Sequence, residues 1–359
     1  MSRRPSVYDD GEPRKGRGFL AGVAGATATL IALGALALAA AVLVYNAPGP
    51  KARQGALTTV ILRHGAGLAE IGAELERGGA VGSAPVFMAA AQLSGGAHRL
   101  KAGEYAFPSR ASLAQVIDKL RRGDIVHHHV TVPEGLTSQQ AVDILNHDPV
   151  LTGAIPTPPE GALLPETYDV VRGEERSAVL ARMMDARDKL LAQLWAKRRP
   201  GLPFSTPEQA VALASIVEKE TATPSERPRV ASVYINRLRI NMRLEADPTL
   251  IYGLNGGLPL GRGLLASELT MPGPYNTYLN YGLPPTPIAN PGRASLAAVL
   301  DPPDTKDIYF VADGTGGHAF AATYEEHLKN VAHWREFERA HPTAPSTGTG
   351  ASALAQPRS

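Results

Sequence analysis

The stretch "LASIVEKETATPSER", residues 213–227, runs from an apolar helical pattern into a segment with three glutamates. Its apolar part ends at Glu218-Lys219-Glu220. Successive residues of an α-helix are about 100° apart, so Glu218 and Glu220 point in directions about 200° apart. The two glutamates therefore do not form an adjacent carboxylate pair. Either they end the helix in solvent beside Lys219, or one of them is held in a site where it moves a proton.

Both glutamates have apolar helix positions in line with them. The positions in line with Glu218 are mostly small and are Val211, Ala214 and Ser215, and those in line with Glu220 are large and are Leu213, Ile216 and Val217. Burial in an apolar cleft raises the pKa of a carboxyl group, which can then serve as a general acid near neutral pH. A helix C-terminus also disfavours negative charge. Helical spacing alone leaves open which glutamate, if either, has this role.

Capping signals give this helix its start. Thr206 is a candidate N-cap, Pro207 suits the first helical position and Gln209 completes the spacing of a capping box. A second helix is predicted over about 226–238, and an earlier one, rich in Arg, Lys and Ala, over about 176–198.

The N-terminal region holds a long apolar run. No residue from Phe19 to Tyr45 is charged, and a helix of that length can cross a hydrocarbon core about 30 Å thick. A cleaved signal peptide or a buried helix is the alternative, but the apolar part of a signal peptide is usually only about 7–15 residues long. The sequence therefore predicts one transmembrane helix over residues 19–45.

The charges on either side of this run predict its orientation. The basic residues before it are Arg3, Arg4, Arg14, Lys15 and Arg17. Only Lys51 and Arg53 follow it closely. By the positive-inside rule, residues 1–18 form a cytoplasmic tail and the rest of the chain is exported.

The exported part begins with a linker rich in proline and glycine, residues 46–55. Three segments then each predict a short strand, a turn and an amphipathic helix, and they are "TVILRHGAGLAEIGAELERGGAV", "AGEYAFPSRASLAQVIDKLRRGDIV" and "HHVTVPEGLTSQQAVDILNHD". Such units suit a compact α+β module in which helices pack on a small sheet.

Beyond residue 240 the regular periodicity fades. The region is dense in Gly, Pro, Asn and Tyr, and long loops of this composition are uncommon without a function. Residues 307–313, "DIYFVAD", predict a strand that returns through "HAFAAT" after a glycine turn. The tail, residues 339–359, is predicted to be disordered.

Composition excludes several functional classes. The formal charge of +2 over 359 residues gives no signature of nucleic-acid binding, and the absence of cysteine excludes disulfides and thiolate metal sites. The "GTGGH" turn lacks the Lys and Ser/Thr of a phosphate-binding loop. Of His127, His128 and His129, only the first and third share a strand face, and no carboxylate spacing supports them. The sequence therefore predicts no metal, no cofactor and no nucleic-acid partner.

Other polar residues have both a structural and a functional interpretation. Asp247 can orient a sugar or cap the turn before Pro248, and "YNTY" at 275–278 can bind sugar or form a turn. Asn236 and Arg237 lie beside an apolar helix stripe, where a surface contact is the ordinary role. His318 follows two glycines, where a loop histidine is usually structural. The residues alone leave each alternative open.

Five motifs together resemble one family. They are "LASIVEKET", "ERPRVASVYINRL", "MRLEADPTLIYG", "YNTYLNYGLPPTPIANPG" and "YFVADGTGGHAF". In order and spacing they resemble the YceG-like family of endolytic murein transglycosylases, densely over 205–335 and more weakly over 56–175, where "PEGLT" and "EGALLPETY" still match. The resemblance implies an α+β fold with a LysM-like module (56–130) and a mixed catalytic domain with long ordered loops (131–338).

The resemblance also implies a chemistry. It makes Glu218 the catalytic residue of a lyase that cleaves the β-1,4 bond from MurNAc to GlcNAc, with the MurNAc 6-hydroxyl as nucleophile and a 1,6-anhydro end as product. One glutamate then serves as acid and base, whereas ordinary glycosidases need two carboxylates. The further positions that match family motifs, and are predicted to bind substrate, are Glu226, Asn236, Arg237, Asp247, Thr249, Tyr275, Asn276, Thr277, Tyr278, Asn290 and His318. In "GALLPETYDV" the chain departs from the aromatic residue and Asp expected around that proline.

The predicted protein is a single-pass inner-membrane enzyme with a cytoplasmic N-terminus and a periplasmic catalytic domain. Its expected partners are the glycan strands of peptidoglycan and the machinery of cell-wall synthesis, and its expected role is to terminate strand elongation. Two alternatives stay open: a membrane-anchored peptidoglycan-binding scaffold without catalysis, and an ordinary hydrolase with a second carboxylate such as Asp247.

Overall fold

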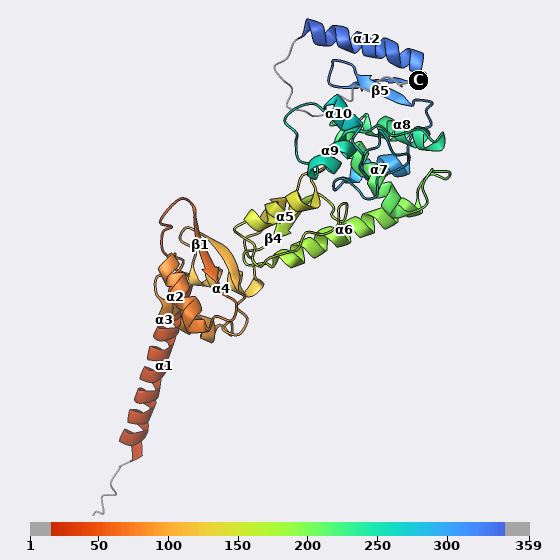
Figure 1. The fold of residues 1–359 in the computed structure, drawn as a ribbon. Coiled ribbons are helices and arrows are strands. Elements are labelled where there is room, and N and C mark those ends of the chain that lie inside the picture. Colours follow the sequence, from red (N-terminus) through yellow and green to blue (C-terminus); the bar gives the residue numbers. More distant parts are fainter. Residues whose placement is uncertain (1–15, 342–359) are drawn as a thin grey trace, which may run out of the picture. The chain divides into compact units, whose positions relative to one another are not determined.

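The computed structural model describes residues 16–341 (Figure 1). The chain divides into two compact units between Val126 and His127, and each is described by itself. The predicted disordered tail begins at residue 339, but residues 339 and 340 are helical, and its residues 342–359 lie outside the described residues. Residues 1–15 of the predicted cytoplasmic tail, with most of its basic residues, also lie outside them.

The first unit begins with α1 (Gly16–Asn46). Its segment Val23–Asn46 has a mean hydropathy of 2.4 and is long and apolar enough to span a membrane. Within the described residues it is the one helix that meets both conditions. Its side chains from residue 23 onward are almost all exposed, which is consistent with a single-pass anchor surrounded by lipid.

A two-stranded antiparallel sheet and three helices form the rest of this unit. The strands are β1 (Leu57–Leu62) and β2 (Gly103–Pro108), and the helices are α2 (Leu68–Gly78), α3 (Ala84–Leu93) and α4 (Leu113–Arg122). The fully buried core side chains include Leu75, Phe87, Tyr105, Ile117 and Leu120. The predicted strand–helix pairs are confirmed here. Helix α3 was not predicted, because its sequence "APVFMAAAQL" has no polar face to give it a period. That this unit is LysM-like stays a prediction.

The segment predicted as a linker is bonded to this unit. The Gly49 N–H donates to the Arg110 carbonyl (3.1 Å), and the Arg110 N–H donates to the Pro50 carbonyl (2.9 Å). The Ala52 N–H donates to Ser109 Oγ (3.1 Å). A Cβ atom at Gly49 would lie 2.1 Å from a backbone oxygen, so only glycine allows this close approach. The connection from α1 is therefore a packed part of the fold.

The second unit opens with the third predicted strand–helix segment. Strands β3 (His128–Thr131) and β4 (Thr167–Val170) pair antiparallel, and α5 (Ser138–His147) and α6 (Arg176–Ala196) pack with them around one apolar cluster (Figure 1). Thr137 caps α5 in a full capping box with Gln140.

A larger cluster surrounds α7 (Pro207–Glu220), which packs against α8 (Arg227–Arg239) and α11 (Arg293–Leu300). The predicted capping box of Thr206 and Gln209 is confirmed. Helix α7 is buried on nearly all sides from Ala210 to Val217, since other elements cover both of its apolar stripes.

The region beyond residue 240 contains short helices, α9 (Asp247–Asn255) and α10 (Ala266–Leu269), separated by long loops. The predicted hairpin is confirmed as β5 (Tyr309–Ala312) and β6 (His318–Ala321), and α12 (Tyr324–Ala340) packs against it. The protein is thus a mixed α+β fold.

Candidate active site

Glu218 lies in the last turn of α7, and its side chain is only 4% exposed. The Arg227 Nη2, at the start of α8, donates to Glu218 Oε1 at 3.1 Å. The backbone N–H of Gly292, which caps the N-terminus of α11, donates to Oε2 at 2.9 Å. A guanidinium and a helix N-terminus both stabilise a carboxylate, so three helix ends meet at this side chain.

A second carboxylate lies beside it. Arg227 Nη2 is also 3.5 Å from Glu134 Oε2, and Glu134 belongs to the loop between β3 and α5. Burial raises the pKa of Glu134, the negative charge of Glu218 raises it further, and Arg227 opposes both. Sequence reasoning missed Glu134 and Arg227 as site residues. The available signals were their places in the family-like phrase "PEGLT" and at the end of the stretch 213–227.

The loop that carries Glu134 is held by backbone and side-chain bonds. The Gly135 N–H donates to the Asn290 carbonyl (3.0 Å), and the Asn290 N–H donates to the Leu136 carbonyl (2.8 Å). The Asn290 Oδ1 accepts from the Leu163 N–H (3.0 Å), and Lys219 Nζ donates to the Gly135 carbonyl (3.2 Å). The predicted residue Asn290 therefore connects this loop to the segment that ends in Gly292.

Glu220, two residues from Glu218, lies in a different environment, as helical spacing predicts. It is 4% exposed and accepts a hydrogen bond from the Tyr234 hydroxyl at 2.7 Å. Burial raises the pKa of Glu220 to about 8, and the negative charge of Asp247 also raises it. The hydrogen bond from Tyr234 lowers this pKa but does not outweigh burial. Burial also raises the pKa of Asp247, whose carboxylate accepts from the Tyr278 hydroxyl. Asp247 thus belongs to the surroundings of Glu220.

Two more predicted residues, Glu226 and His318, form a close pair. Their side chains approach to 2.7 Å between Oε2 and Nδ1, and the His318 backbone N–H donates to Glu226 Oε1 at 2.8 Å. Thr223 Oγ1 donates to the Gly316 carbonyl at 3.2 Å. These contacts bind the loop between α7 and α8 to the turn between β5 and β6. They therefore fix the position of Arg227, the first residue of α8.

The buried pair Asn236 and Arg237 on α8 contacts backbone carbonyls. Asn236 Nδ2 donates to the carbonyls of Thr305 (2.9 Å) and Asp307 (3.0 Å). Arg237 Nε donates to the Ile308 carbonyl at 2.7 Å, and its Nη1 donates to the Leu244 carbonyl at 2.9 Å. Substrate binding by this pair stays a prediction.

The remaining predicted residues bond to one another and to nearby loops. Thr249 and Thr277 share a hydroxyl hydrogen bond of 2.8 Å, and the Tyr275 hydroxyl lies 2.8 Å from Thr286 Oγ1. Asn276 Nδ2 donates to the Leu269 and Met271 carbonyls. These bonds order the loops beyond residue 240, and substrate binding by these residues also stays a prediction.

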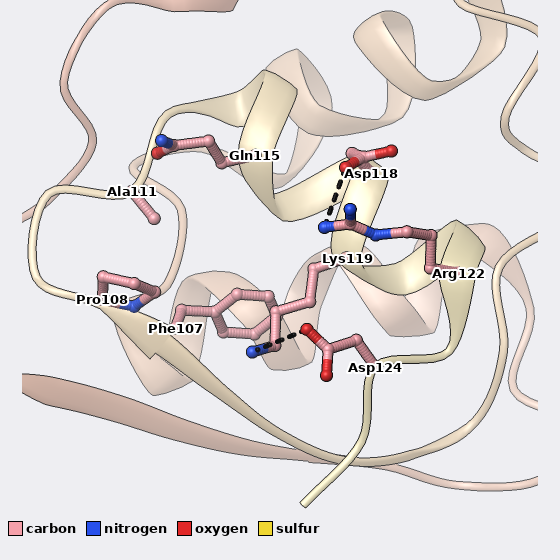
Figure 2. Close-up of a pocket in the computed structure, with 8 residues that line it drawn as sticks. All are labelled: Phe107, Pro108, Ala111, Gln115, Asp118, Lys119, Arg122 and Asp124. Carbon is pink, nitrogen blue, oxygen red and sulfur yellow. Dashed lines mark ion pairs between the residues drawn. The ribbon is translucent and has the colours of Figure 1, made fainter.

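Two surface hollows lie in the first unit. One, of about 220 Å³, is lined by Phe107, Pro108, Ala111, Gln115, Asp118, Lys119, Arg122 and Asp124 (Figure 2). Ion pairs join Lys119 to Asp124 (3.3 Å) and Arg122 to Asp118 (3.0 Å) at its edge (Figure 2). The other, of about 320 Å³, lies where α1 meets the unit. Neither contains a predicted site residue. Within residues 16–341, no group of three or more His, Asp or Glu is arranged to hold a metal ion.

Comparisons with known proteins add to this geometry. A model of the YceG-like family matches residues 60–333. The endolytic murein transglycosylase of Bacillus subtilis (strain 168) is 33% identical over 187 residues, which are 52% of this chain and 51% of that protein. That of Streptococcus pneumoniae serotype 2 (strain D39) is 27% identical over 321 residues, 76% of this chain and 58% of that protein. The chain thus spans about half the length of these curated relatives. The crystal structure of a YceG-like protein from Listeria monocytogenes is 28% identical, with a TM-score of 0.47, and the match covers 77% of this chain and 99% of that one.

Proposed function

The chain belongs to the YceG-like family, and we propose that it is an endolytic lytic transglycosylase of peptidoglycan. It cleaves the MurNAc–GlcNAc β-1,4 bond of nascent glycan strands and leaves 1,6-anhydroMurNAc ends. The observation that carries this proposal is the setting of Glu218, a buried carboxyl group with one cation and one backbone N–H directed at it.

The proposed reaction uses Glu218 twice. The protonated carboxyl group gives its proton to the glycosidic oxygen as the bond to the anomeric carbon breaks. The resulting carboxylate, stabilised by Arg227 and the Gly292 N–H, then accepts the proton of the MurNAc 6-hydroxyl as that oxygen bonds to the anomeric carbon. No water is consumed, and because the nucleophile belongs to the same sugar, little entropy is lost in bringing it to the reacting carbon.

We propose that the enzyme acts at the outer face of the inner membrane. Helix α1 is the anchor, with its N-terminus in the cytoplasm and the chain that follows it in the periplasm. Its partners are growing glycan strands and the enzymes that synthesise them, and its cleavage releases those strands from further elongation.

Substitution of Glu218 tests the proposal directly. The Glu218→Gln protein should fold and insert in the membrane but release anhydro-muropeptides from uncrosslinked glycan at least about a hundredfold more slowly, as measured by mass spectrometry. Glu220→Gln is the matched control on the same helix and should retain release, since its bonds lie on the other side of α7. Unchanged anhydro products from the Glu218→Gln protein would show that another residue is the acid.

A second candidate function follows from Glu134. An ordinary glycosidase uses two neighbouring carboxylates, one as acid and one as base or nucleophile. Glu134 and Glu218 contact the same guanidinium nitrogen, whereas Asp247 lies with Tyr278. A hydrolase would leave reducing ends, which are heavier than anhydro ends by one water. A single product mass therefore separates the two reactions.

A further inference from the structure

The contact between Glu134, Arg227 and Glu218 raises a question of charge. Arg227 Nη2 lies 3.1 Å from Glu218 Oε1 and 3.5 Å from Glu134 Oε2. One positive charge thus faces two carboxylates. A general acid must begin the reaction protonated, whereas a guanidinium hydrogen-bonded to a carboxyl group stabilises the carboxylate. Another negative group must therefore balance the positive charge of Arg227 while Glu218 is protonated.

The three side chains form a gradient of exposure. Glu134 is 40% exposed, Arg227 13% and Glu218 4%. The outermost carboxylate can exchange protons and ions with solvent, whereas the innermost one cannot do so directly. Arg227 lies between them, and its buried Nε has no hydrogen-bond partner within the described residues. Its bonding capacity is therefore not used up by either carboxylate.

Glu134 is held at this place by the protein. Its loop is fixed by the backbone bonds of Gly135 and Leu136 to Asn290 and by the bond from Lys219. A Cβ atom at Gly292 would lie 1.8 Å from Glu134 Oε1, so the carboxylate packs directly against the residue whose N–H contacts Glu218. The fold therefore fixes the position of the Glu134 carboxylate beside Gly292.

The other charged groups around the pair come from three elements. Glu166, next to β4, faces Glu134 and pairs with Arg293 of α11 at 3.2 Å. Lys219 of α7 follows Glu218, and burial lowers its pKa while the charge of Glu218 raises it. The Glu166–Arg293 pair is balanced, so the remaining charges around Glu218 are those of Glu134, Arg227 and Lys219.

We propose that Glu134 is a positioning residue for Glu218: it holds the Arg227 guanidinium while Glu218 is protonated and yields it when Glu218 becomes a carboxylate. This inference rests on the proposed function, because it assumes that Glu218 alternates between acid and base. The proximity of the Glu218 charge, which raises the pKa of Glu134, supports it. Glu134 itself transfers no proton to substrate.

The test compares the pH dependence of kcat for the full-length protein in detergent, acting on uncrosslinked glycan, with that of Glu134→Gln. Without the Glu134 charge, Arg227 pairs only with Glu218 and favours its carboxylate. The alkaline limb of kcat, where Glu218 loses its proton, should move to lower pH by about one unit, with little change in KM. Glu134→Asp keeps the charge and should restore the limb at least in part. Glu70→Gln is the matched control, because Glu70 is a similarly exposed carboxylate (42%) that pairs with Arg63 in the first unit, and it should leave the limb in place.

A second measurement does not depend on activity. The side-chain carboxyl carbons of ¹³C-labelled glutamate, assigned through the Glu134→Gln and Glu218→Gln proteins, report each titration by NMR. In the wild-type protein, Glu134 and Glu218 should titrate as a coupled pair, and removal of one should shift the other by about one pH unit. Independent titration, or an alkaline limb unmoved in Glu134→Gln, overturns the inference. If the wild-type protein releases no anhydro ends, the proposed function fails, and the NMR titration still decides whether the two groups are coupled.

Discussion

The two ends of the sequence "EKE" lie on one helix turn and in opposite chemical settings. Glu218 contacts a guanidinium and a backbone N–H, and through Arg227 it reaches Glu134, which is 40% exposed. Glu220 contacts the hydroxyl of Tyr234, which is only 2% exposed, and lies near the carboxylate of Asp247. Burial raises the pKa of Glu220 to about 8. A strongly shifted pKa thus marks burial here, whereas the candidate for catalysis is distinguished by directed donors and by a neighbour that solvent reaches.

The largest expected effect separates the two glutamates by activity. General acid–base catalysis contributes a factor of about 10²–10⁴, so Glu218→Gln should lower kcat by that amount. Glu220→Gln should lower it by less than about tenfold, because the amide still accepts the Tyr234 hydrogen bond. The measurement is the rate of anhydro-muropeptide release by each purified protein at equal folded concentration. Equal losses of kcat in the two proteins would contradict the assignment of different roles to Glu218 and Glu220.

A smaller effect is expected from Gly292→Ala. The backbone at Gly292 has φ −76°, which alanine adopts without strain, but the new Cβ would meet the Glu134 carboxylate at 1.8 Å. Glu134 should therefore swing away from Arg227, and activity should fall about tenfold with the alkaline limb moved as in Glu134→Gln. The control is Gly67→Ala, since Gly67 also caps a helix at φ −72° and a Cβ there meets nothing within 4 Å. A normal pH profile in the Gly292→Ala protein would contradict the account of Glu134.

The smallest effect concerns stability and belongs to Glu220. Its pKa is raised from 4.5 to about 8, so the folded protein binds this proton more tightly than the unfolded chain does. The stability from this group is complete below about pH 4.5 and is lost as pH rises toward 8, at roughly 1 kcal/mol per pH unit.

Glu220→Gln removes this dependence. Its melting temperature should exceed that of the wild-type protein at pH 9 and lose that advantage near pH 5, as followed by circular dichroism. Glu325→Gln, at an 80% exposed position on α12, is the control that should show no such crossover. Parallel curves for Glu220→Gln and the wild-type protein would mean that Glu220 ionises freely in the fold.

Local signals were sufficient to predict part of this fold. The capping box at Thr206, the strand–helix pairs and the hairpin at residues 309–321 depend on neighbours in sequence, and all are present. Helices α9, α10 and α11 were missed, because they are short and the bonds that order this region, such as those of Asn276 and Thr277, cross between loops. Propensity and periodicity do not register such tertiary bonds.

The site was predictable to a similar degree. Helical spacing separated Glu218 from Glu220, and a family resemblance selected Glu218, whose catalytic role stays a proposal. Glu134 could not be paired with Glu218 from sequence, because Arg227, which contacts both, reaches Glu134 across 93 residues of the chain, and the Glu134 loop is held by Asn290.

The hydrogen bonds of residues 49–52 to the first unit limit how far that unit can move from the end of α1. With no slack between α1 and that unit, a membrane that holds the helix also sets the height of the unit above the lipid surface. If the chain acts on peptidoglycan as proposed, the first unit meets only polymer that comes within that fixed distance. Proximity to the bilayer would then be a criterion of selection, ahead of any recognition of sugar.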